Sequence, residues 1–204
     1  MKGLFITFEG IDGCGKSTQI GKLAEYLEKK QVPLLFVREP GGTAIGEKIR
    51  NILLDKKSDG MCNMTELLLF EAARAQITEE KIIPATASGT TVLCDRFFDS
   101  TVAYQGYARD MGHETVSNLN MLATGGKSPD ITFLFDISPE EAFARRSDRG
   151  EEDRLEGLGL EFQRRVREGY LEMAKTSDRI KVIDASRSVD EISAEVLGYI
   201  SEVV

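Results

Sequence analysis

The stretch FITFEGIDGCGKSTQIGKL, residues 5–23, begins as a short apolar run, passes through closely spaced glycines and continues as a helix-like segment. Within it, residues 10–17 match the pattern G-x-x-x-x-G-K-[ST]. In such a loop the glycines let backbone N–H groups turn inward around phosphate oxygens, and the N-terminus of the next helix adds partial positive charge. We therefore predict a strand, a loop that binds a nucleoside triphosphate, and a helix.

The side chains of this loop receive separate roles. Lys16 is expected to reach the outer phosphates and Ser17 to ligate magnesium. Asp12 is either a solvated loop carboxylate or the partner of a hydroxyl or a metal-bound water. The residues predicted to bind the nucleotide are Gly10, Ile11, Asp12, Gly13, Cys14, Gly15, Lys16, Ser17 and Thr18. The loop has one lysine before its helix and no arginine, so further positive charge must come from elsewhere.

The composition excludes several classes of protein. A chain of 204 residues with 41% apolar residues is typical of one soluble domain, and it contains no apolar run long enough for a membrane span. A net charge of −8 argues against broad nucleic-acid binding. Three cysteines without a C-x-x-C spacing favour a reducing, cytoplasmic location, and one histidine makes a histidine-based triad or zinc site a poor explanation.

Short apolar runs alternate with amphipathic segments of helix length. The predicted strands are 4–8, 34–37, 91–94, 131–135 and 181–183, and the predicted helices include 16–30, 64–87, 138–146 and 160–175. This alternation predicts an α/β fold with a five-stranded parallel sheet covered by helices on both faces. We find no repeat or linker, so residues 1–204 are expected to form one domain. Ligands of such sheets bind at the carboxyl ends of the strands.

Charged residues follow two of these strands. The third strand leads into Asp95 and Arg96, where the carboxylate could hold magnesium through water and the arginine could stand beside phosphates. The alternative is an ion-paired strand end. Arg38 follows the second strand in REPGGT, which is either a turn before a helix capped by Thr43 or a source of charge. Together, Arg38 and Arg96 could clamp the phosphate of an acceptor.

An acceptor phosphate would explain how the chain works with one unremarkable histidine. A phosphate monoester has a second pKa near 6, so it is a nucleophile at neutral pH and needs no general base. The sequence contains no Asn-Lys-x-Asp motif of a GTPase and no extended Asp-Glu pair after a strand. A kinase is therefore favoured over a switch or a motor ATPase.

At this point the chain resembles the thymidylate kinase family over essentially its whole length. The resemblance rests on the motifs FEGIDGCGKST, REPGGT, LLFEAARAQ, DRFFDSTVAYQG, SPDITFLFD and RGEEDRLE, in this order. It implies a P-loop kinase fold, a homodimer, and transfer of the γ-phosphoryl group of Mg-ATP to dTMP in dTTP synthesis. The rivals are another nucleoside monophosphate kinase and a nucleotide-binding regulatory protein that has lost the transfer.

The resemblance also assigns an acceptor site. Phe70 and Arg74 share one helix face, and the family uses such a pair to stack on thymine and to bond its O4. From the residues alone, a core phenylalanine beside a surface arginine is the simpler reading. Asp12 would hold the 3′-hydroxyl of the sugar. The remaining acceptor-site residues, some of which could instead be core or helix-surface positions, are Arg38, Arg96, Ser100, Thr101, Tyr104 and Gln105.

A mixed-charge segment at about residues 145–157 is expected to be a lid over the ligand edge, although such runs are ordinarily solvated faces. Family members supply an arginine to the transferring phosphate from either the phosphate loop or the lid. Gly13 stands at the loop position where some members carry arginine, so the lid should supply it through Arg149. Arg145, also predicted to bind ATP, or Arg154 would assist.

Overall fold

The computed structural model describes residues 2–146 and 154–201. Five strands form one parallel sheet in the order β2-β3-β1-β4-β5. Their bounds are Phe5–Glu9 (β1), Leu34–Arg38 (β2), Thr91–Asp95 (β3), Ile131–Asp136 (β4) and Ile180–Asp184 (β5). Each predicted apolar run is therefore a strand: β1 is shifted by one residue from the predicted 4–8, and the other four strands are one or two residues longer than predicted.

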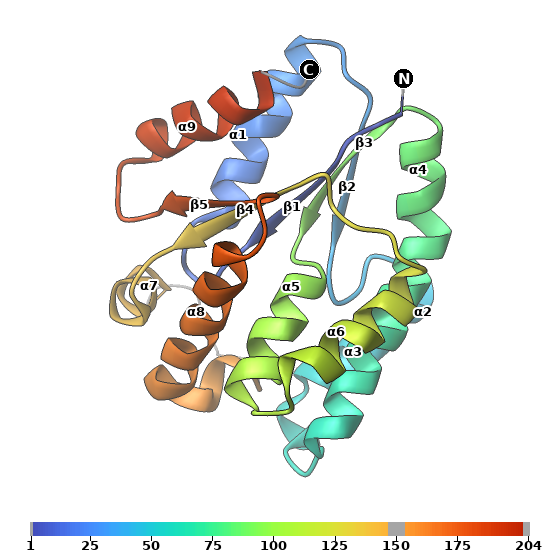
Figure 1. Ribbon diagram of the computed structural model, residues 1–204, viewed down its shortest axis with the longest axis vertical. Helices are drawn as coiled ribbons and strands as arrows, with labels where there is room; N and C mark the ends of the chain where they lie inside the picture. The colour runs from blue at the N-terminus through green and yellow to red at the C-terminus, as the bar shows by residue number, and fades with distance from the viewer. Residues whose placement is uncertain (1, 147–153, 202–204) are drawn as a thin grey trace.

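Helices cover both faces of the sheet (Figure 1). The α-helices are α1 (Lys16–Lys29), α2 (Ala44–Leu54), α3 (Asn63–Ile77), α4 (Ile83–Ala87), α5 (Phe98–Thr101), α6 (His113–Thr124), α7 (Pro139–Arg146), α8 (Gly159–Lys175) and α9 (Val189–Ser201). Ile6 of β1 lies in one core cluster with Leu23 of α1, whereas its neighbour Phe5 lies in another cluster with Ile77 of α3. Because successive strand residues point to opposite faces, β1 supplies apolar side chains to both layers. The predicted α/β class is confirmed.

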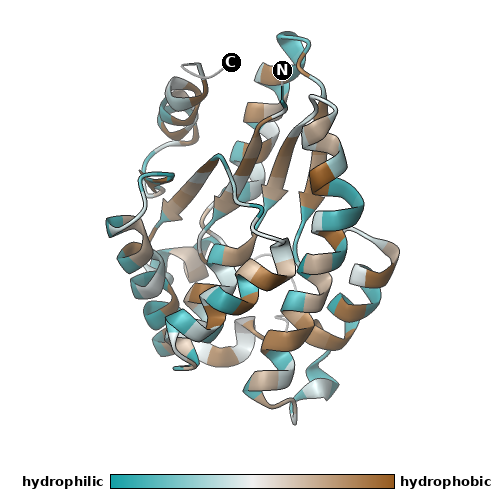
Figure 2. Cartoon of the chain, turned by 45° about the vertical axis from the view of Figure 1, so that its right-hand side comes forward, coloured by the Kyte–Doolittle hydropathy of each residue, from teal (hydrophilic) through white to brown (hydrophobic). Residues whose placement is uncertain are grey.

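All five strands end in a charged residue: Glu9, Arg38, Asp95, Asp136 and Asp184. Figure 2 shows the strands mostly in the hydrophobic colour, with hydrophilic colour at their carboxyl ends. The chain adds strands first on one side of β1, where β3 lies, and then on the other side, where β4 lies. This is the place where open parallel sheets bind ligands, and it is where the loop after β1 lies.

The predicted helix 64–87 is interrupted. α3 ends at Ile77, a π-helical segment η2 (Thr78–Ile82) follows, and α4 begins at Ile83. Pro84 stands in the first turn of α4. Proline has no backbone N–H that could donate to a carbonyl of the preceding turn. The π-helical segment changes the hydrogen-bond pattern just before Pro84, where that donor is missing. Apolar periodicity does not reveal this change of hydrogen-bond pattern.

No helix in the two described segments is long and apolar enough to cross a bilayer.

Candidate active site

One cavity of about 200 Å³ lies at the carboxyl ends of the strands. Fourteen of the predicted site residues line it: Asp12, Gly13, Gly15, Lys16, Ser17, Thr18, Arg38, Phe70, Asp95, Arg96, Ser100, Thr101, Tyr104 and Gln105. The residues that sequence reasoning did not assign to it are Glu39, Pro40, Arg50, Leu54 and Leu155. The phosphate loop and the proposed acceptor residues therefore share one space.

The phosphate loop has the expected strand-to-helix form. Lys16 is buried and its Nζ donates to Gly10 O at 3.0 Å and to Ile11 O at 3.2 Å, which ties the loop to the start of its own helix. The side chains of Ile11 and Cys14 pack in the hydrophobic core, and neither they nor Gly10 line the cavity. A role in binding the nucleotide would have to come from their backbone groups.

Gly13 has a structural reason to lack a side chain. Its φ of +91° favours glycine, and a Cβ built there would lie 2.3 Å from Ala142 O of α7. Any larger residue would have to displace α7 as well as adopt a strained backbone. An arginine at this loop position would therefore be unfavourable with α7 placed as it is.

The pair Asp95–Arg96 is not an ion pair within itself. Arg96 Nη2 lies 2.8 Å from Asp12 Oδ1, while Asp95 Oδ1 is buried without a hydrogen-bond partner among the described residues. Ser17 is exposed on the cavity wall. An unpartnered carboxylate oxygen and a hydroxyl at a phosphate loop are oxygen ligands of the kind that Mg²⁺ prefers. The residues present therefore fit the predicted metal.

Arg96 is held by a network that sequence reasoning missed. Its Nη1 donates to Ser100 Oγ at 3.1 Å and to Tyr170 OH at 3.3 Å. Both hydroxyls lie within hydrogen-bond distance of Glu9 Oε2, at 2.6 and 2.9 Å. The carboxylate Glu9 also accepts from Phe97 N–H at 2.6 Å. The fully buried Glu9 thus supports Arg96 through two hydroxyl groups.

Burial and neighbouring charges shift the pKa values of Glu9 and Arg96 in this network. Burial raises the pKa of Glu9 to about 7, and the nearby Asp99 carboxylate adds to the effect. Burial opposes the charge of Arg96, but Asp12 overcomes it and raises the Arg96 pKa. Arg96 therefore stays a cation on the cavity wall.

The REPGGT segment forms the predicted turn before a helix capped by Thr43, and it also brings Arg38 to the cavity; the role of Arg38 toward a phosphate stays a prediction. Thr43 Oγ1 accepts from Gly46 N–H and caps α2, and Arg38 lines the cavity. Arg38 Nη2 pairs with Glu47 Oε2 at 3.0 Å. Arg50 of α2 also lines the cavity, with its Nη1 bonded to Pro40 O at 2.9 Å. No local motif marks Arg50, because it reaches the site only through the packing of α2.

Phe70 and Arg74 have different surroundings. Phe70 lines the cavity, whereas Arg74 is 1% exposed and lies outside the cavity lining. Arg74 forms ion pairs of 2.7 Å with Glu39 and with Glu71. The simple reading of a surface arginine is wrong. A contact between Arg74 and a base stays a prediction.

The residues after Asp95 lie on a short helix that becomes a π-helical segment, η3 (Val102–Ala108). Thr101, Tyr104 and Gln105 are buried and line the cavity. Thr101 Oγ1 and Tyr104 OH are buried without hydrogen-bond partners among the described residues. Since buried polar atoms are ordinarily paired, these hydroxyls are available to a ligand.

The lid residues are described only in part. Arg149 lies outside the described residues. Arg145 Nη1 donates to Ala185 O at 2.8 Å, which places it at the loop after β5. Arg154 Nη1 pairs with Glu66 at 2.7 Å and its Nε donates to Leu53 O, so these groups bind protein rather than a phosphate.

Comparison with known proteins agrees with this geometry. The thymidylate kinase family model matches residues 8–196. A thymidylate kinase from Caldanaerobacter subterraneus subsp. tengcongensis is 49% identical over 203 residues, covering 99% of this chain and 97% of its own length. One from Chlorobium luteolum is 48% identical over 209 residues, with 98% and 97% covered. The chain belongs to the thymidylate kinase family.

Proposed function

We propose that residues 1–204 act as one kinase domain that transfers the γ-phosphoryl group of Mg-ATP to dTMP, giving dTDP and ADP. The observation that carries the proposal is the shared cavity. The phosphate loop lines one part of it, and Arg38, Arg50 and Arg96 line another together with Phe70. These cations are gathered locally in a chain whose net charge is −8.

Catalysis in this site is positioning and charge neutralisation. Backbone N–H groups of the loop and Lys16 hold the donor phosphates. Ser17 and Asp95 would hold Mg²⁺, which when bound would supply charge neutralisation on those phosphates. Arg38 and Arg96 place the acceptor phosphate, which attacks without a general base because it is ionised at neutral pH. Arg149 and Arg145 serve the donor side from the lid segment 145–157.

The acceptor nucleoside is recognised by shape and by few polar groups. Phe70 supplies an aromatic plate for the base, and Arg74 supplies the donor that selects a carbonyl over an amino group. Thr101 and Gln105 approach the base edge. Tyr104 packs against the sugar, and Asp12, beside Arg96, accepts from the 3′-hydroxyl.

The test is ADP release in a coupled assay with a panel of acceptors: dTMP, dUMP, UMP, CMP and AMP. We expect dTMP to give the highest kcat/KM. A higher kcat/KM with CMP or AMP would indicate another nucleoside monophosphate kinase. Nucleotide binding without turnover of any acceptor would indicate a regulatory protein.

The proposal includes a cytoplasmic homodimer. The segment α5–η3, which follows Asp95, is mostly buried within the chain by α6 and α8, so it is a poor interface element. Exposed apolar side chains instead lie on the adjacent helices α3 and α6: Met64, Leu68, Met121 and Leu122. Light scattering after size exclusion should give twice the chain mass of 22.6 kDa, and Leu122→Glu should shift it toward the monomer.

A further inference from the structure

Glu66 is a buried carboxylate at the junction of three segments. It lies on α3, one helical turn before Phe70, and is 1% exposed. Its Oε1 accepts from Gln105 Nε2 at 2.8 Å, and Arg109 Nη2 lies 3.0 Å from its Oε2. Arg154 Nη1 lies 2.7 Å from Oε2. Glu66 does not line the cavity itself, but Gln105 does.

The groups around Glu66 show that it is an anion. Arg109 and Arg154, whose side chains can only donate, both place guanidinium nitrogens within 3.2 Å of its oxygens. Burial alone would raise the pKa of Glu66, but the hydrogen bonds from Gln105 and Arg109, with the nearby charges, hold it below the ordinary value. An ionised carboxylate accepts hydrogen bonds and cannot donate them.

This charge state fixes the orientation of the Gln105 side chain. An amide can present either its NH₂ or its carbonyl oxygen to a neighbour, and the two ends are nearly the same in shape. Beside an anion that only accepts, the NH₂ end must face Glu66. The carbonyl oxygen is then the end of the amide left for the cavity. A hydrogen-bond acceptor at this position favours a base with a ring N–H over one with a ring lone pair.

Glu66 supports a second part of the cavity wall through Arg154. Arg154 Nε donates to Leu53 O at 2.7 Å, and its backbone N–H donates to Leu54 O. Leu54 and Leu155 both line the cavity. The same carboxylate therefore holds one polar wall and one apolar wall.

We propose that Glu66 is a positioning residue for acceptor selectivity, which fixes the Gln105 amide so that its carbonyl accepts from the ring N–H of a thymine-like base. The proposal rests on the acceptor-site role of Gln105 given above. Cytosine carries a lone pair at the equivalent ring nitrogen, so it would set two acceptors against each other and leave both unpaired. In the absence of the Glu66 charge, the amide can turn over and donate to that lone pair.

The experiment measures selectivity as the ratio of kcat/KM for dTMP to kcat/KM for dCMP, in the wild type and in Glu66→Gln. We expect this ratio to fall at least about tenfold in the variant, through a higher KM for dTMP and better use of dCMP. Binding of each nucleotide without ATP, measured by calorimetry, should show the same loss. A wild type that does not phosphorylate dTMP would overturn the proposed function instead, so the two failures are distinguishable.

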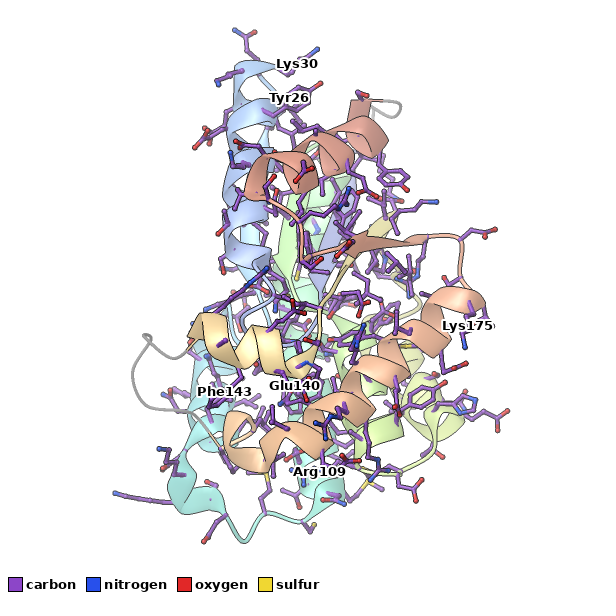
Figure 3. All side chains as sticks on the ribbon, turned by 90° about the vertical axis from the view of Figure 1, so that its left-hand side faces the viewer. Tyr26, Lys30, Arg109, Glu140, Phe143 and Lys175 are labelled. Carbon is purple, nitrogen blue, oxygen red and sulfur yellow. The ribbon has the colours of Figure 1, made fainter. Side chains whose placement is uncertain are left out.

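The matched control is Arg109→Met. Arg109, labelled in Figure 3, contacts Glu66. Its guanidinium lies over the ring of Phe162 of α8, and Arg109 is not among the residues that line the cavity. A purely structural role of Glu66 predicts equal effects of the two variants on the selectivity ratio, and that result would overturn the proposal. We expect Arg109→Met to change the ratio less than about twofold, since Gln105 keeps its acceptor.

Thermal unfolding shows whether each variant is folded. If Glu66→Gln does not fold, Gln105→Met decides the question, because it removes the amide and leaves Glu66 with its arginines. The proposal predicts the same loss of selectivity in Gln105→Met, and wild-type selectivity in this variant would contradict it.

Discussion

The two sides of the cavity are built in opposite ways. The proposed donor side is one contiguous loop, residues 10–18, in which backbone N–H groups and Lys16 are expected to hold the phosphates. The acceptor side is assembled from the end of β2, from α2, α3 and η3, and from Arg96 after β3. A phosphate chain can be held by closely spaced backbone donors, whereas a nucleoside requires groups that meet from several directions.

The two sides also differ in how charge is buried. The acceptor side places its arginines beside carboxylates: Arg74 pairs with Glu39, and Arg96 pairs with Asp12, which the loop contributes. An isolated buried charge costs several kcal/mol, so each ion needs a partner in a fixed position. Such pairs hold their arginines in place. We therefore expect substitutions on the donor side to affect the chemical step. Substitutions on the acceptor side, where arginines are held by carboxylates, should affect binding and stability.

The largest expected effect is on the donor side. Lys16→Met should lower kcat by about 10³-fold, because it removes the main side-chain cation of the loop from the transferring charge. The affinity for dTMP should change little. Steady-state kinetics with both substrates and calorimetry with dTMP alone measure the two quantities. Lys22→Met, which removes a surface pair with Asp190, is the control on the same helix. An equal loss of dTMP affinity in Lys16→Met would break the comparison.

On the acceptor side, Arg96→Met should lower kcat/KM for dTMP by about 10²-fold, mainly through a higher KM. The change removes a cavity cation and its pair with Asp12. Arg96→Lys should recover only part of the loss, because a lysine cannot hold Asp12 and Ser100 with separate nitrogens of one fork. Initial rates over a range of dTMP and ATP concentrations separate the two KM values. A change confined to the KM for ATP would assign Arg96 to the donor side.

The lid arginine should give a smaller effect. Arg149→Met is expected to lower kcat at least about tenfold and to spare nucleotide affinity, because an arginine of this type stabilises mainly the transition-state charge. Arg164→Met is the control, since it removes a charge from the exposed face of α8. Single-turnover rates measure the chemical step. An unchanged rate in Arg149→Met would mean that another arginine reaches the transferring phosphate.

The sequence predicts the donor side better than the acceptor side, because the donor side is one contiguous loop and the acceptor side comes from several segments. Residues 10–18 carry a local motif, so the strand, loop and helix could be predicted from spacing alone. Apolar runs similarly marked the five strands. The acceptor residues Phe70 and Gln105 were assigned by resemblance to a family, because no local pattern distinguishes them from core positions.

Contacts between distant segments escaped sequence reasoning altogether. Tyr170 of α8 contacts Glu9, which lies 161 positions earlier in the chain, and Arg154 contacts Glu66 of α3. Such pairs depend on how helices pack over the sheet, which periodicity does not encode. One signal was present: Glu9 is a carboxylate at the end of a buried apolar strand. Residues of this kind are ordinarily exposed unless they are paired, so its position indicated a polar network.

Glu9 also gives the smallest of these effects, which tests the electrostatics of the acceptor side. Its pKa is raised from 4.5 to about 7, first by burial and then by Asp99. Between these values the folded protein binds a proton that the unfolded chain has lost, so stability falls as pH rises through this window. The stabilisation that comes from protonated Glu9 is fully present below pH 4.5 and is lost as the pH rises through 7. The free energy of unfolding changes by about 1–3 kcal/mol over this range.

Glu9→Gln removes this titration, so its free energy of unfolding should fall less than that of the wild type between pH 5 and pH 8. The variant is expected to be less stable at pH 5, because its NH₂ group replaces an oxygen that accepts from Ser100 and Tyr170. The difference should narrow as the pH rises. Urea unfolding at pH 5, 6, 7 and 8 measures it, with Glu25→Gln on the exposed face of α1 as the control. Parallel curves for the wild type and Glu9→Gln would show that the Glu9 carboxylate is ionised throughout, held by its hydroxyl partners and Arg96 rather than by a proton.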